Sequence, residues 1–162
     1  MQPTMLPEAT PLWTDAMLRV LAATAAGGLL GLNRELTRKP AGLRTHALVA
    51  LGAALVTVSA LQLGVGPDRT HGDPASRVIQ GVIAGIGFLG GGVILHADGR
   101  NVQGLTTAAT IWVAAALGIS CGIGQWHIAG LTAALALVVL VIGQVVENAL
   151  HRFKRPEKPE SE

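Results

Sequence analysis

The chain has 162 residues, of which 50% are hydrophobic and only 14% are charged, and its formal net charge is +2. A soluble domain of this size needs far more charge to cover its surface, so the composition excludes an ordinary soluble protein and indicates a polytopic membrane protein. The single cysteine, Cys121, excludes an internal disulfide and a cysteine metal site. The small basic excess is not the footprint of a nucleic-acid-binding protein.

The apolar runs predict an all-α protein with five transmembrane helices. A spanning helix needs about 20 mostly apolar residues, because it rises about 1.5 Å per residue through a hydrocarbon core of roughly 30 Å. Residues 1–11, with three prolines, are interpreted as a disordered lead-in, and residues 151–162 as a basic tail. One membrane domain, residues 12–150, is expected between them, with spans at 12–32, 43–63, 76–95, 104–123 and 126–150.

The first span begins beside Trp13, a residue type that anchors helices at the membrane interface. Asp15 and Arg19 lie one helical turn apart in it. A local ion pair at headgroup depth is the favoured interpretation of Arg19, and a role in binding a substrate is the alternative.

The basic residues predict the orientation. Most of the 12 Lys and Arg residues lie in the segments after the first and third spans and in the C-terminal tail. Because cytoplasmic segments carry the excess of positive charge, we expect the N-terminus outside and the C-terminus in the cytoplasm.

Glycines dominate the third span. Gly81 and Gly85 are four residues apart, as are Gly87 and Gly91, which is the spacing of small-residue stripes that let membrane helices approach closely. We therefore expect the third and fourth spans to form the tight centre of the bundle. Residues 85–90 also fit the G-x-G-x-x-G pattern, but that pattern indicates nucleotide binding only between a strand and a helix. The short glycine-rich break before residue 126 predicts that the last two spans are adjacent and antiparallel.

Polar residues gather at the predicted cytoplasmic ends of the spans. If the first four spans pack together, these residues meet at one depth. They either cap helix ends and set the topology, or form a recognition site for an anion, a metal or a membrane helix of a partner. For Arg34, Glu35, Arg44 and Asn101 the two interpretations are equally weighted, whereas Arg38, Lys39 and the tail fit the first. The gathered residues are Asn33, Arg34, Glu35, Arg44, Thr45, His46, Asp98, Arg100, Asn101, Thr106 and Thr107.

No acid lies in the middle of a predicted span, which disfavours a conventional divalent-cation transporter, although backbone carbonyls can replace carboxylates. The weak metal candidates are Glu35, Asp98 and Asn101, with Mg²⁺ as the ion they suit; no other cofactor is expected. The five histidines fall near span ends without metal-site spacing, which favours interface or turn roles. Cys121 and His127 do not make a convincing nucleophile and base, so we expect no enzyme.

Three long blocks resemble the MgtC/SapB family of bacterial inner-membrane proteins. They read GLLGLNRELTRKPAGLRTHALVALGAAL, QGVIAGIGFLGGGVIL and NVQGLTTAATIWVAAALGISCGIGQ. The resemblance implies a five-helix inner-membrane domain with a cytoplasmic C-terminus. Many members carry an acid where this chain has Asn33. Several members also continue into a cytoplasmic regulatory domain, whereas this chain ends soon after the fifth span, so we expect the membrane domain alone. The positions that match functional residues of the family are Arg34, Ala41, Gly42, Leu43, Arg44, Thr45, Asn101, Thr107 and Cys121, the last a recurrent cysteine.

The resemblance also implies a role. Family members are linked to growth under low magnesium and to survival inside macrophages, and are often labelled magnesium transporters. A competing view is that they bind and regulate another membrane complex, such as the proton-translocating ATP synthase. We expect a regulator that contacts membrane lipid and such a complex; a divalent-cation transporter or channel is the alternative, and a homo-oligomeric scaffold is a third hypothesis.

Overall fold

The computed structural model describes residues 12–63, 74–95 and 103–153, and every helix in this part of the chain is long and apolar enough to cross a membrane. The all-helical prediction is confirmed, since the described residues contain no strand. Asp98, Arg100, Asn101, residues 1–11 and most of the tail lie outside the described residues. The helices are α1 (Leu12–Leu36), α2 (Leu43–Leu63), α3 (Pro74–Leu95), α4 (Leu105–Ile123) and α5 (Trp126–Phe153).

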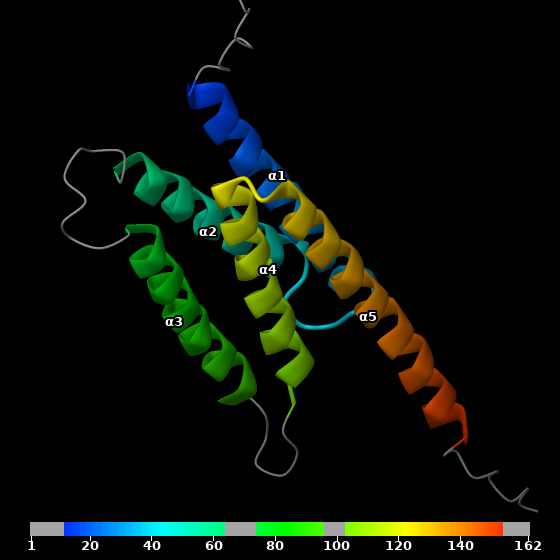
Figure 1. The fold of residues 1–162 in the computed structure, drawn as a ribbon. Helices are drawn as coiled ribbons and strands as arrows, with labels where there is room; N and C mark the ends of the chain where they lie inside the picture. The colour runs from blue at the N-terminus through cyan, green and yellow to red at the C-terminus, as the bar shows by residue number, and fades with distance from the viewer. Residues whose placement is uncertain (1–11, 64–73, 96–102, 154–162) are drawn as a thin grey trace, which may run out of the picture.

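α2 forms the centre of the bundle. Its contacts with α1 and with α4 are the two most extensive of the fold, and α1 and α4 also touch each other. Figure 1 shows α3 on one side of α4 and α5 on the other. The expectation that the third and fourth spans form the tight centre is therefore wrong: the compact unit is α1, α2 and α4, and α3 and α5 pack against its outside.

Glycines explain why α2 occupies the centre. On α1, a Cβ at Gly27 would lie 2.6 Å from Ala50 Cβ, and one at Gly31 would lie 2.6 Å from the Gly42 oxygen. On α4, a Cβ at Gly118 would collide with the backbone oxygen of Ala50. Both helices thus approach α2 to a distance that a side chain would prevent, and the gain in van der Waals contact holds the three helices together in lipid.

The glycine stripes of α3 behave differently. Nothing lies within 4 Å of a Cβ built at Gly81, Gly85, Gly87 or Gly91. α3 meets the bundle through other residues, among them the buried Ile86, which packs against Ile111 and Ala115 of α4. The predicted glycine face is present, but a Cβ at any of these four glycines would meet no other described residue.

α1 continues to Leu36, four residues beyond the predicted end, and stops in a left-handed turn. The Arg38 N–H donates to the Glu35 oxygen at 3.0 Å and the Lys39 N–H to the Arg34 oxygen at 3.0 Å, the paired bonds of a Schellman motif. Arg38 takes the left-handed position of that motif, with φ 53°. Pro40 then disfavours helix at Lys39, so the chain turns here.

The opposite end of the bundle closes through Arg19. Its Nε lies 2.8 Å from Asp15 Oδ2, which confirms the predicted ion pair. Its Nη1 also donates to the backbone oxygen of Gly122 at 2.8 Å, so this arginine ties α1 to the last turn of α4. The next residues form the turn at Gly124, with φ 86°, after which α5 runs back beside α4, as the short break predicted.

Candidate functional site

Arg34 joins the two polar segments that the sequence placed at one end of the bundle. Its Nη2 donates a hydrogen bond to Thr107 Oγ1 at 2.7 Å, which links the last turn of α1 to the first turn of α4. Both residues are buried, with 4% and 2% of their surface exposed. The prediction that these segments converge is thus confirmed for Arg34 and Thr107.

The charge of Arg34 is only partly compensated. Among the described residues no carboxylate pairs with it, and its Nε is buried without a hydrogen-bond partner. An arginine side chain stays protonated. Burying a charge without a counter-charge costs on the order of several kcal/mol of folding free energy. This position in the fold is therefore suited to an anion.

Glu35 has a different task. Its Oε2 accepts a hydrogen bond from the N–H of Leu43 at 2.9 Å, so the carboxylate caps the first turn of α2. A Cβ at Gly42 would collide with the same Oε2, so the cap requires the glycine. The capping interpretation explains Glu35 and Gly42 without a metal.

Arg44 and Thr45 are exposed, and neither lines the pocket described below. His46 is fully buried, and its Nδ1 donates to the Gly42 oxygen at 2.9 Å. Of the two roles expected for the histidines, burial excludes the interface role for His46, whereas its bond to Gly42 in the first turn of α2 fits the turn role. Because Gly27 has no side chain, α1 packs directly over the backbone of His46 and covers the residue.

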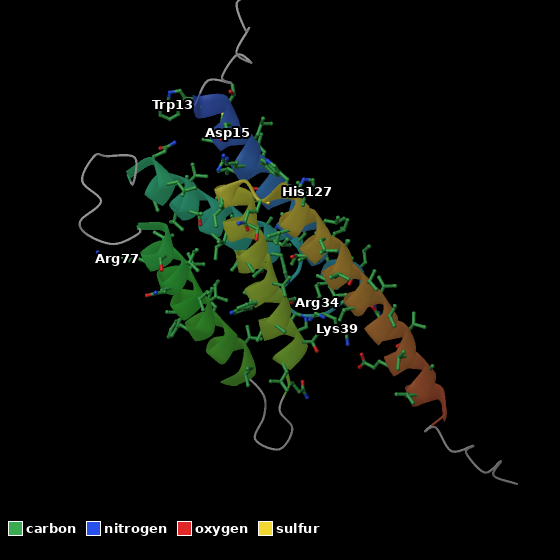
Figure 2. All side chains as sticks on the ribbon, viewed as in Figure 1. Trp13, Asp15, Arg34, Lys39, Arg77 and His127 are labelled. Carbon is green, nitrogen blue, oxygen red and sulfur yellow. The ribbon has the colours of Figure 1, made fainter. Side chains whose placement is uncertain are left out.

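A pocket of about 1220 Å³ opens beside Arg34. Figure 2 shows Arg34 and Lys39 close together between α5 and the lower part of α4, and both line the pocket. Sequence reasoning assigned Lys39 only to topology and missed the part taken by α5. The signal for that part is Gln144, a polar residue in an otherwise apolar run. The lining residues come from α1 and the loop after it (Asn33, Arg34, Thr37, Lys39, Pro40), α3 (Phe88, Leu89, Gly92, Val93), the start of α4 (Gln103 to Thr107) and α5 (Val139, Leu140, Gly143, Gln144, Glu147).

The remaining candidates do not gather into a metal centre in the described part of the chain, where no three His, Cys, Asp or Glu side chains lie together. Cys121 is 2% exposed and packs in an apolar cluster with Leu30 and Leu117, so it is a core residue of the α1–α2–α4 unit. His127 is exposed on α5. Asp98 and Asn101, the other two metal candidates, lie outside the described residues.

The sequence matches the model of the MgtC family over residues 20–149. The "Protein MgtC" of Salmonella typhi is 39% identical over 147 residues, which cover 90% of this chain and 59% of that protein. The "Protein SrpB" of Synechococcus elongatus is 44% identical over 123 residues, covering 72% of this chain and 68% of that protein. This chain thus spans about three fifths of the length of the Salmonella relatives. No solved structure matches it.

Proposed function

Because this chain belongs to the MgtC family, we propose that it is a multi-pass protein of the bacterial inner membrane that regulates another membrane complex and so supports adaptation to low magnesium. The proton-translocating ATP synthase is the complex we propose. The distribution of basic residues supports a cytoplasmic C-terminus.

The observation that carries the proposal is the open glycine face of α3. Gly81, Gly85, Gly87 and Gly91 each have open space where a side chain would be. Only 6% of the most apolar stretch of α3 is buried, against 56% for α4. Lipid tails are as apolar as leucine, so a glycine stripe gains nothing from facing lipid. The same stripe lets the backbone of a second helix approach closely. The face supports docking of a membrane helix.

The same helix also carries a large exposed aromatic side chain, Phe88. Phe88 lies between Gly87 and Gly91 in sequence and is 84% exposed. A partner helix with small residues opposite Phe88 would bury a large aromatic surface, which is the usual anchor of a protein interface. Docking thus has both a site of close backbone approach and an anchor.

The test is a matched pair of glycine-to-leucine variants. Gly85→Leu fills the open face of α3, and Gly130→Leu adds the same bulk on α5, where the Cβ also meets nothing within 4 Å. Both variants should insert and unfold like the native chain. Gly85→Leu alone should lose co-purification with ATP synthase from native membranes and lose its effect on ATP-driven proton pumping in inverted vesicles. Normal capture and normal regulation by Gly85→Leu would overturn the proposal.

Two further measurements separate the competing functions. Saturable magnesium flux in liposomes that contain only this protein would support the transporter instead.

Since the chain has one cysteine and it is buried, a Gly81→Cys variant gives a clean crosslinking probe on α3. Crosslinking between two copies in native membranes would favour the homo-oligomeric scaffold, and crosslinking to a second protein would favour the regulator.

A further inference from the structure

The pocket beside Arg34 has two chemically different parts. Arg34 and Lys39 lie at one part, together with the N-terminus of α4. The apolar side chains of α3 and α5 form the other part, among them Phe88, Leu89 and Val139. A ligand that fills the pocket therefore needs a negative group and an apolar body.

The polar part is built for an anion. The first backbone N–H groups of an α-helix have no carbonyl partner within the helix, and the helix dipole adds partial positive charge there. At α4 the N-cap is Gly104, with φ 85°, and no side chain caps the helix among the described residues. The Thr106 side chain lines the pocket at this terminus and adds a hydroxyl donor.

Arg34 gives an independent reason to place an anion here. Its side chain lines the pocket although only 4% of the residue is exposed, and its Nε has no partner in the described part of the chain. One of its nitrogens is held by Thr107, which fixes the guanidinium at the first turn of α4. The unpaired charge and the uncapped helix end thus lie at the same place, where a phosphate group would satisfy both.

Among the described residues that line the pocket, one is an acid. Glu147 Oε2 is 3.8 Å from Lys39 Nζ, and 54% of the Glu147 side chain is exposed. The contact is loose and half solvated, so it holds Lys39 only weakly. An anion in the pocket would compete with Glu147 for this lysine.

The position of the pocket selects a lipid over a soluble anion. The Phe88, Leu89 and Val93 side chains on α3 and Val139 and Leu140 on α5 lie within helices that can span a membrane. Acyl chains reach such surfaces directly from the bilayer, whereas a water-soluble phosphate ester has no apolar part to place there. Basic pockets between membrane helices on the cytoplasmic side are typical sites for anionic lipid headgroups.

We propose that this pocket binds one anionic phospholipid, with its phosphate held by Arg34, Lys39 and the N-terminus of α4, and with an acyl chain along α3 and α5. The site shares Phe88 with the proposed docking face, but Lys39 and Gly143, at which binding is tested, lie outside α3, so the lipid is tested without altering the open glycines. A bound lipid would fix α3 and α5 to the α1–α2–α4 unit at the end of the bundle where the pocket opens.

The test is native mass spectrometry of the full chain in detergent, titrated with phosphatidylglycerol or with zwitterionic phosphatidylcholine. The native protein should retain one phosphatidylglycerol with at least about tenfold preference. Lys39→Gln should weaken that binding about tenfold, the usual cost of one charge-assisted contact. Glu147→Gln should strengthen it by releasing Lys39. Arg44→Gln removes an equal charge at an exposed position outside the pocket and should bind like the native protein.

A second variant blocks the pocket without changing any charge, as a check that the effect of Lys39→Gln arises in the pocket. Gly143 lines the pocket and its Cβ position is open, so Gly143→Leu should fold normally and exclude the lipid. Equal retention of the two lipids by the native protein would overturn the proposal, as would unchanged phosphatidylglycerol binding in both Lys39→Gln and Gly143→Leu. Displacement of the lipid by millimolar inorganic phosphate would show a site for free phosphate and also reject the lipid.

Discussion

Arg34 Nη2 and Thr107 Oγ1 are 73 residues apart in the sequence and 2.7 Å apart in the structure. This hydrogen bond joins the end of α1 to the start of α4 beside the pocket. Because the guanidinium is buried, its donors cannot bond to water, and the hydroxyl accepts from one of them. This bond therefore contributes more to stability than an exposed contact would.

Thr107→Val keeps the shape of the side chain and removes the acceptor. The free energy of unfolding should fall by about 2 kcal/mol, the usual range for a hydrogen bond to a charged group. Titration of the purified protein from mild detergent into dodecyl sulfate measures this. Thr106→Val, at the exposed neighbouring position, should change the unfolding free energy by less than about 0.5 kcal/mol. Equal effects of the two variants would show that the Arg34 bond contributes nothing special.

Glycine-to-alanine substitutions should have opposite effects on the two kinds of glycine in this fold. At Gly118 the new Cβ collides with the Ala50 backbone oxygen, so Gly118→Ala should destabilise the protein by about 2 kcal/mol through overpacking. At Gly85 the space is open, so Gly85→Ala should be neutral or stabilise by up to about 1 kcal/mol through helix propensity. Unfolding in detergent again measures both. Destabilisation by Gly85→Ala in the isolated protein would contradict the open α3 face.

Arg38→Gly should stabilise the turn between α1 and α2. Arg38 has φ 53°, a conformation that costs an L-residue about 1–2 kcal/mol and costs glycine nothing. After the greater freedom of glycine in the unfolded chain is subtracted, a gain of about 0.5–1 kcal/mol remains. Lys39→Gly serves as control, since Lys39 lacks a positive φ and gains nothing from glycine. A loss of stability in Arg38→Gly would contradict the left-handed turn.

Arg19 should contribute more to the free energy of unfolding than its ion-pair partner Asp15. Arg19→Met removes both the contact with Asp15 and the hydrogen bond to the Gly122 oxygen, so the unfolding free energy should fall by about 1–2 kcal/mol. Asp15→Asn leaves the bond to Gly122 in place, and its carboxylate is 44% exposed, so the loss should stay near 0.5 kcal/mol. The reverse order would mean that the ion pair, not the tie to α4, holds α1 at this end.

Glu35→Ala removes the side-chain cap of α2. The N–H of Leu43 then loses its acceptor, and the unfolding free energy should fall by about 1 kcal/mol, as for other N-caps. Glu35→Gln retains an acceptor oxygen and should recover most of that loss. If magnesium protected the native protein from unfolding but not Glu35→Gln, the carboxylate would bind metal rather than cap the helix.

The helices themselves were largely predictable from hydropathy. The predicted range 43–63 agrees with α2 at both ends, and the other spans differ from the observed helices by a few residues. The largest difference is at the end of α1, which continues through Arg34 to Leu36. Hydropathy ended the span at the first polar residues, whereas burial of Arg34 against Thr107 keeps that turn in the bundle.

The candidate site was only partly predictable. Arg34 and Thr107 were singled out because a charge and a hydroxyl at span ends are informative in a membrane protein, and they do meet. Lys39 and the pocket residues of α5 were missed, because α5 is far away in sequence and its contribution to the pocket depends on how it crosses α4.

The sequence by itself determined that the described part of the chain has five helices long and apolar enough to span a membrane, where they lie, and that small residues govern their packing. Only the tertiary structure decided which glycines meet a neighbour: Gly27, Gly31 and Gly118 lie against α2, and the stripes of α3 lie open. The physical reason is that lipid and protein interior are equally apolar. A helix face turned to lipid can therefore carry the same apolar and small residues as one turned to another helix, and only the pairing of the helices distinguishes them.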